Sequence, residues 1–242
     1  MSLNLTKTNY IIFGIKHKPD LDPSLDIVIN DFKIARESKV KFLGTYIDED
    51  LKWKSHASYI ALKISRSIGI INRLKYILSK DVLRSLYFTL IHPYLLYCNI
   101  AWGNASKNVL NRLRILQKKA LRLITKSQYR DHTDPLFSST RIPNLTNIHL
   151  MQKCLFMYKY KLNLLPECCY HLIEPARNPP SYAFRNVTYF PRHPCKTNLR
   201  EKSIFISGAI AWNNLPVDVK NLKSLSSFKK KLFHFFCVSV II

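Results

Sequence analysis

Four basic residues between positions 107 and 122 have the types and the spacing that suit contact with phosphates along a nucleic-acid strand. Lys107, Arg114, Lys118 and Arg122 fall within a narrow sector of a helix, opposite an apolar stripe. Such a row rises about 6 Å per step, comparable with the phosphate spacing of a strand. We predict that the row contacts phosphates and reads no bases, because phosphate contacts position a protein without specifying sequence. The alternative interpretation is a solvated helix face.

Three further basic residues, Lys63, Arg66 and Arg73, occupy the outer side of an earlier amphipathic segment. Residues 51–130 contain 16 basic residues and a single acid, Asp81. So many like charges repel one another, and a bound polyanion relieves this repulsion. Solubility alone is served equally well by mixed charges. We therefore predict RNA, an RNA–DNA hybrid or a DNA duplex as the partner, and we rank an anionic membrane surface second.

An acidic cluster, Asp48-Glu49-Asp50, immediately precedes the first helical segment. Two aspartates separated by one residue could hold Mg²⁺. Acids at this place also complement the amino-terminus of a helix. We favour helix capping over a metal site.

Zinc-type ligands occur in two small groups, Cys168, Cys169 and His171, then His193 and Cys195. Their spacing matches no standard zinc motif, and an adjacent cysteine pair suits one tetrahedral site poorly. We predict no metal site, with a structural zinc as the less favoured alternative. The five glycines are scattered, so no phosphate-binding loop is expected, and no nucleophile elbow or metalloprotease helix is present.

The six cysteines and the lack of a signal-length apolar segment at the start favour a reduced, intracellular protein of the nucleus or cytoplasm. The apolar tail 232–242 is about half as long as a bilayer-spanning helix. We expect the tail to be buried, or else not to be native coding sequence, and we expect no membrane partner. With 47% hydrophobic residues the chain can form a core, so disorder is not expected.

The elements that must position these residues predict an α+β, mainly α fold in three parts. Residues 1–50 are weakly charged and show strand-like runs over 3–15 and 24–47, which predicts a small antiparallel sheet. Residues 51–130 change to helical periodicity, with helices from Trp53, from Lys80 and over 106–125, and with a kink at Pro93. They predict a basic three-helix bundle.

Residues 131–242 predict a second helical region. Its expected helices cover about 145–163, 203–213 and 224–236, and Pro216 separates the last two. A Pro-rich connection over 175–194 cannot be regular helix or central strand.

Several sequence strings, in order and with similar gaps, resemble the end of the reverse transcriptase of jockey-like LINE (non-LTR) retrotransposons. They are LNLTKTNYIIFG, KFLGTYIDEDLKWKSHASYI, LIHPYLLYCNIAWG, LNRLRILQKKALRLIT, DPLFSSTRIPNLTNIHLMQKCLFMYKYKLNLLP, SIFISGAIAWNNLP and SLSSFKKKL. The resemblance covers nearly the whole chain. It implies that residues 1–50 are the end of the polymerase palm, 51–130 the helical thumb and 131–242 a carboxy-terminal extension.

By resemblance, Lys7 matches the palm lysine near the phosphates of the incoming nucleotide. Phe42, Leu43 and Gly44 match the hairpin that steadies the primer end, and the first and third helices of the thumb would follow the template–primer duplex. These roles are implied by the family and not by spacing.

The family's catalytic Tyr-X-Asp-Asp turn and earlier aspartate would lie upstream of the Lys7 motif, and the chain has no Asp-Asp pair. Phosphoryl transfer in such enzymes needs two carboxylate-held Mg²⁺ ions. We therefore expect a fragment of an RNA-directed DNA polymerase that binds template–primer without catalysis. Its cofactor Mg²⁺ and its missing palm and fingers would belong to the full-length enzyme. The alternative is a host-adopted, non-catalytic module that binds nucleic acid or protein.

Overall fold

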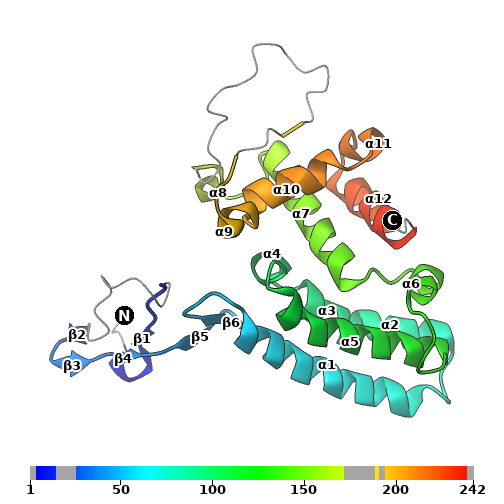
Figure 1. Ribbon diagram of the computed structural model, residues 1–242, viewed down its shortest axis with the longest axis horizontal. Helices are drawn as coiled ribbons and strands as arrows, with labels where there is room; N and C mark the ends of the chain where they lie inside the picture. The colour runs from blue at the N-terminus through cyan, green and yellow to red at the C-terminus, as the bar shows by residue number, and fades with distance from the viewer. Residues whose placement is uncertain (1–3, 15–25, 172–188, 191–193, 239–242) are drawn as a thin grey trace.

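The computed structural model describes residues 4–14, 26–171, 189–190 and 194–238 (Figure 1). Helices dominate, and the described strands form three separate pairs near the amino-terminus. The predicted α+β, mainly α fold is confirmed.

Two of the strand pairs are antiparallel, as predicted, and the third is parallel. Strand β2 (Val28–Ile29) pairs with β3 (Phe32–Lys33), and β5 (Lys39–Phe42) pairs with β6 (Thr45–Asp48). Strand β1 (Asn9–Tyr10) runs parallel to β4 (Ala35–Arg36), so the expectation of one antiparallel sheet was wrong in this detail.

The strand expected over 3–15 is reduced to β1, because a 3-10 turn, η1 (Leu5–Lys7), precedes it. Asn4 accounts for the turn. Its carbonyl accepts from the Thr8 hydroxyl at 2.8 Å, and its side-chain oxygen accepts from the Thr6 hydroxyl at 2.7 Å. Such local bonds compete with strand pairing. Lys7 therefore lies on an exposed turn and not beside a strand.

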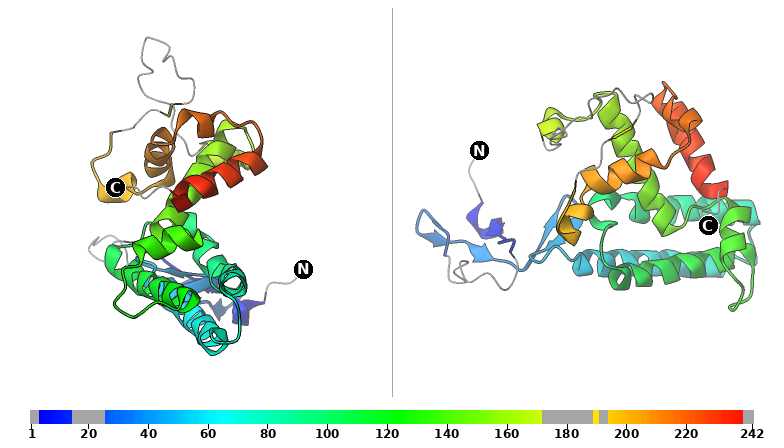
Figure 2. Two further views of the ribbon diagram at one scale, coloured as in Figure 1. Left: turned by 90° about the vertical axis from the view of Figure 1, so that its right-hand side faces the viewer. Right: turned by 45° about the horizontal axis from the view of Figure 1, so that its top comes forward.

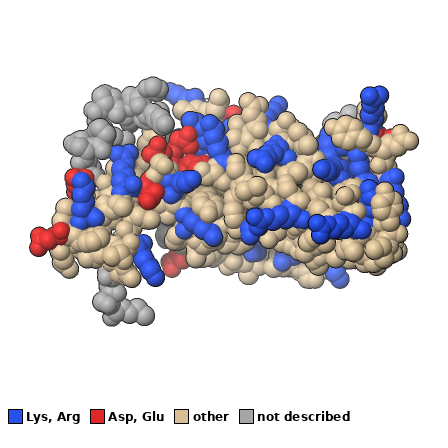
Figure 3. Space-filling view, turned by 90° about the horizontal axis from the view of Figure 1, so that it is seen from below, with Lys and Arg blue, Asp and Glu red and all other residues tan. Residues whose placement is uncertain are grey.

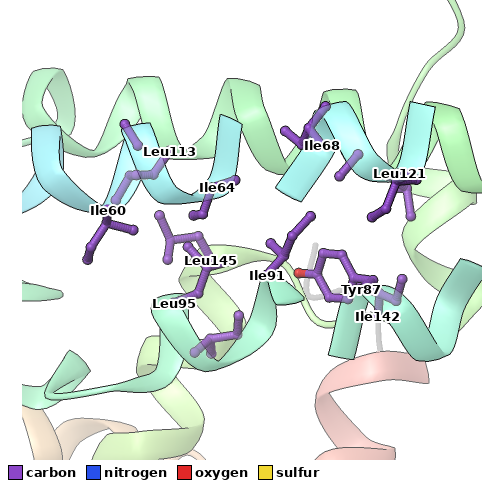
Figure 4. Close-up of a cluster of buried hydrophobic side chains, with 14 of the residues drawn as sticks. Ile60, Ile64, Ile68, Tyr87, Ile91, Leu95, Leu113, Leu121, Ile142 and Leu145 are labelled. Carbon is purple, nitrogen blue, oxygen red and sulfur yellow. The ribbon is translucent and has the colours of Figure 1, made fainter. Parts of the chain in front are cut away.

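The predicted three-helix bundle consists of α1 (Lys54–Leu74), α2 (Lys80–Leu90) and α5 (Lys107–Thr125). Ser79 and Ser106 cap α2 and α5 by accepting from the backbone N–H groups of Val82 and Val109. Helices α1 and α5 lie side by side and run in the same direction (Figures 1 and 4).

The expected kink at Pro93 is instead a break. Helix α2 ends at Leu90, and α3 (His92–Leu96) restarts with Pro93 in its first turn, where its missing N–H is not needed. A further short helix, α4 (Asn99–Trp102), follows. Leu95 of α3 and Trp102 of α4 are buried in the core of the bundle.

One continuous apolar cluster fills the bundle (Figure 4). Ile60, Ile64 and Ile68 of α1 face Leu113 and Leu121 of α5, with the side chains of α2 and α3 beneath them. The cluster also includes Phe137, Ile142, Leu145 and Ile148. The bundle core thus extends past residue 130.

The second helical region contains the three helices that the sequence predicted, α7 (Leu145–Lys161), α10 (Ile204–Asn213) and α12 (Leu225–Val238). Shorter helices not predicted are α6 (Asp134–Thr140), α8 (Glu167–His171), α9 (Asn198–Glu201) and α11 (Val217–Lys220). Figure 2 shows this region lying together on one side of the bundle. Most of the Pro-rich connection 175–194 lies outside the described residues.

A second apolar cluster holds this region together. Trp212 lies at its centre and is fully buried, and the rings of Tyr158 and Phe228 stack with centroids 4.0 Å apart. Leu232 and Phe236 of the apolar tail are part of this cluster, as expected for a buried tail. Residues 239–242 lie outside the described part.

Helix α7 takes part in both clusters. Its first turn contributes Leu145 and Ile148 to the bundle, and its later part contributes Cys154, Met157 and Tyr158 to the second cluster. The helix therefore joins the two cores directly.

Buried Gln117 fixes the start of α7 against the bundle. Its side-chain nitrogen donates to the Tyr87 hydroxyl at 2.8 Å and to the Pro143 carbonyl at 2.9 Å. Its side-chain oxygen accepts from the Leu145 N–H at 2.9 Å. One amide thus links α5, α2 and α7.

A second polar junction is centred on buried His149 of α7. Its ring nitrogens lie 2.8 Å from the side-chain oxygens of Asn99 and of Asn104. Burial and then the charge of Lys153 lower the pKa of His149 to about 3, so the ring is neutral at pH 7. Gly103 packs against the ring, since an added Cβ would lie 2.2 Å from Nδ1.

Candidate nucleic-acid interface

The outer side of α1 carries two fully projecting cations of the predicted set. Arg66 and Arg73 are exposed, whereas Lys63 is half-buried. The Lys63 ammonium lies 5.6 Å from the centroid of the Tyr59 ring, a cation–π contact that holds it near the start of the helix. Arg66 and Arg73 therefore present their charge to solvent from positions about two turns apart.

The predicted row on α5 divides into two projecting and two inward-turned residues. Lys107 and Lys118 are exposed. Arg114 is half-buried and lines a small cavity beside His149. Arg122 is half-buried, donates to the Asp131 carbonyl at 3.0 Å and lies 5.8 Å from the Tyr129 ring centroid. The row as a whole does not lie opposite the apolar stripe.

Two exposed cations of α5, Arg112 and Lys119, were missed by the sequence interpretation. Arg112 lies about 200° around the helix from Arg114, at roughly 3.6 residues per turn. Because Arg114 faces α7, Arg112 points to the other side of α5, where α1 lies (Figure 1). Measuring the rotation from the buried residues Leu113 and Leu121 would have identified this side.

The face formed by α1 and α5 is therefore cationic. We call it the α1–α5 face and define it by Arg66, Arg73, Arg112 and Lys119; Lys107 and Lys118 lie closer to Arg114, on the other side of α5. Figure 3 shows Lys and Arg side chains distributed along the helices, while Asp and Glu gather toward the amino-terminal strands. Exposed Leu62 and Ile115 lie on the same helices. A phosphate bound here would contact cations. Residues 51–80 and 82–130 contain no acid that would repel it.

The hairpin that carries Phe42, Leu43 and Gly44 projects beside this bundle. Phe42 and Leu43 are 61% and 74% exposed, although both are large and apolar. Leu43 and Gly44 have positive φ angles of 45° and 83°, which form the turn between β5 and β6. The Tyr97 hydroxyl donates to the Leu43 carbonyl. The hairpin tip is thus held in place while its apolar side chains remain free.

A cation–aromatic cluster joins the hairpin to α1. Lys41 lies 5.6 Å and 5.9 Å from the ring centroids of Tyr59 and Tyr46, and the two rings contact edge to face at 5.2 Å. With Lys63 on the same Tyr59 ring, two cations converge on one aromatic side chain. The hairpin and the first turns of α1 form one surface.

One residue of the acidic cluster, Asp48, bonds to the start of α1, as the capping interpretation predicts. Asp48 accepts from the Ser55 N–H at 3.3 Å, in the first turn of α1. Asp50 accepts from the Lys52 N–H and forms an ion pair with the Lys52 side chain at 2.8 Å. The hydrogen bond from the Lys52 side chain, and after it the bond from the Lys52 N–H, lower the pKa of Asp50. Asp48 thus contacts the first turn of α1, whereas Asp50 contacts Lys52, which precedes the helix.

The remaining predicted residues lie apart from the α1–α5 face. Lys7 is on the exposed turn η1. No group of three or more potential metal ligands occurs among the described residues. The zinc alternative falls partly outside them, because His193 and the side chain of His171 are not described. No helix in the described ranges has the length and apolarity needed to cross a bilayer.

Fold and surface together define a mainly helical protein with one strongly cationic helical face. Two curated relatives are similar in sequence, both titled RNA-directed DNA polymerase from mobile element jockey. The Drosophila funebris protein is 25% identical over 122 residues, 49% of this chain, and the Drosophila melanogaster protein is 28% identical over 145 residues, 58% of this chain. These matches confirm the resemblance to jockey-like non-LTR retrotransposon reverse transcriptases.

The matched segments span 13% and 15% of the length of those relatives. No family model matches the chain, and no solved structure matches it.

Proposed function

We propose that the chain supplies the template–primer-binding surface of a mobile-element reverse transcriptase, through the α1–α5 face. The face would hold an RNA–DNA or DNA duplex by its phosphates. The exposed hairpin tip at Phe42 and Leu43 would lie beside the primer end. No residue of the chain is proposed to take part in phosphoryl transfer.

The observation that carries this proposal is the exposure of cations on two adjacent helices. Arg66 and Arg73 are exposed on α1, and Arg112 and Lys119 are exposed on the neighbouring α5. None of these four side chains forms an ion pair within the described part of the chain. A polyanion along the two helices would neutralise charges that the protein itself leaves uncompensated.

The test is duplex binding at several salt concentrations. Replacing Arg66 and Arg73 with Gln should reduce the slope of log affinity against log salt by about 1.8 on B-form DNA, since each lost phosphate contact contributes about 0.9. Arg112→Gln with Lys119→Gln should do the same. Gln preserves helix propensity, so helicity should be unchanged.

A matched control removes the same charge elsewhere. Lys202 and Lys223 are exposed and lie in the second helical region, so Lys202→Gln with Lys223→Gln should leave the slope nearly unchanged. A third variant, Lys107→Gln with Lys118→Gln, compares the salt slope for the two sides of α5. Equal slope losses in the control and in the α1–α5 variants would refute the proposal, because binding would then depend on net charge alone.

A further inference from the structure

A cavity of about 440 Å³ lies where α2, the end of α6 and α12 meet. Four of its lining residues are permanent cations, Arg84, Arg141, Lys229 and Lys230. None of the described residues that line it is an acid. In Figure 4, α12 lies below α2 while α1 and α5 lie above it, so the cavity is on the opposite side of the bundle from the α1–α5 face.

The cations of this cavity are not neutralised by the protein. None of the four takes part in an ion pair with another described residue. Cys237 also lines the cavity, but burial raises the pKa of its thiol to about 11, so it carries no negative charge at pH 7. The cavity therefore concentrates positive charge in a partly enclosed space, which favours an anionic ligand.

One cation is fixed in position before any ligand binds. The Arg84 Nε donates to the Thr140 carbonyl at 2.6 Å, and its guanidinium lies 4.9 Å from the Phe88 ring centroid. Phe88 in turn contacts Phe233, with centroids 6.2 Å apart. Arg84 thus loses little further freedom on binding, while Lys229 and Lys230 are exposed and can adapt.

The cavity has an aromatic wall as well as cations, because Phe233 and His234 line it. Its volume falls within the range of roughly 300–1,000 Å³ usual for small-molecule sites, well above what one phosphate fills. An aromatic side chain beside cations is the combination that holds unpaired bases by stacking and their backbone by charge. In a duplex the base faces are already stacked on their neighbours, so an unpaired nucleotide suits this wall better.

We propose that this cavity binds an unpaired nucleotide of a single-stranded nucleic acid, with the base on Phe233 and the phosphates on Arg84, Arg141, Lys229 and Lys230. The site is separate from the α1–α5 face, and it is shared between the bundle and the last helix. A single strand bound there would hold α12 to α2 and α6.

The experiment measures binding of a short fluorescein-labelled oligouridylate by anisotropy at several salt concentrations. Lys229→Gln with Lys230→Gln should reduce the log–log salt slope by about 1.4, at roughly 0.7 per contact on a single strand. Phe233→Leu, which keeps apolar volume, should weaken binding roughly fivefold or more without changing the slope. Lys202→Gln with Lys223→Gln is the control of equal charge.

Three outcomes would overturn the proposal. Equal slope losses in the cavity and control variants would mean general charge attraction. Unchanged affinity in a folded Phe233→Leu variant would mean that no base stacks there. If the cavity variants lost binding to phosphatidylserine vesicles but retained oligouridylate binding, the cavity would be assigned to a membrane surface. Blunt-duplex affinity should be unaffected by the cavity variants, so failure here is distinguishable from failure of the α1–α5 face.

Discussion

Replacing Gln117 with Leu tests whether one buried amide fixes α7 to the bundle. Leu has nearly the same volume, so packing changes little. The change leaves the Tyr87 hydroxyl, the Pro143 carbonyl and the Leu145 N–H without the partners that Gln117 provides. A buried polar group left without its bond costs about 1–3 kcal/mol, so three such groups predict a loss of about 3 kcal/mol or more. That is a large share of a typical stability of roughly 5–15 kcal/mol.

Urea unfolding followed by far-ultraviolet circular dichroism measures this loss. Gln128→Leu is the matched control, because Gln128 is exposed and the change should cost less than about 0.5 kcal/mol. Adding Tyr87→Phe to Gln117→Leu should cost about 1 kcal/mol less than the sum of the single changes, since the orphaned hydroxyl is gone. A Gln117→Leu variant within about 1 kcal/mol of the parent would refute the reasoning, because even one unsatisfied buried group should cost that much.

Two further predictions concern His149 and the glycines. The pKa of His149 is lowered from 6.5 to about 3 in the folded chain, so the unfolded chain binds the proton first as the pH decreases. The free energy of unfolding should therefore fall between pH 6.5 and pH 3. Urea midpoints measured across this range test the prediction, and a midpoint that does not change with pH would contradict it. Gly103→Ala should cost about 1–3 kcal/mol by overpacking, because its Cβ would lie 2.2 Å from His149. Gly69→Ala should instead stabilise α1 by about 1 kcal/mol, because nothing lies within 4 Å of an added Cβ at that position. Thermal melts of both variants test these two predictions, and equal changes in melting temperature would contradict them.

The long helices could be predicted because periodicity and end signals agree. Ser106 begins α5 and Asn144 caps α7, each with a side chain that accepts from a backbone N–H in the first turn. The short helices α4, α6, α8, α9 and α11 escaped prediction because each is too short to show a period. At residues 4–8 the expected strand is absent because local bonds of Asn4 replace pairing.

The candidate site was predicted in outline and not in detail. Charge distribution alone marked residues 51–130, and Arg66, Arg73, Lys107 and Lys118 are exposed as expected. Periodicity predicts on which side of its helix a residue lies, but it does not predict which other segment of the chain packs against that side. Helix α7 covers Arg114, and the Asp131 carbonyl engages Arg122; both partners lie beyond the segment that carried the pattern. The cavity cations Arg84, Arg141 and Lys229 come from distant parts of the sequence, so no local motif contains them.

Helix α7 connects the bundle, which carries the α1–α5 face, to the region of α12, which lines the cavity. The helix is embedded in both cores, so the bundle and the last helix are joined by a rigid element about 25 Å long rather than by a flexible tether. When two sites are held at a fixed spacing, the second contact forms at a high effective concentration if the ligand spans that spacing, and is lost entirely if it does not. If the α1–α5 face and the cavity both bind nucleic acid as proposed, a fixed spacing between them would favour ligands in which a duplex continues into a single strand.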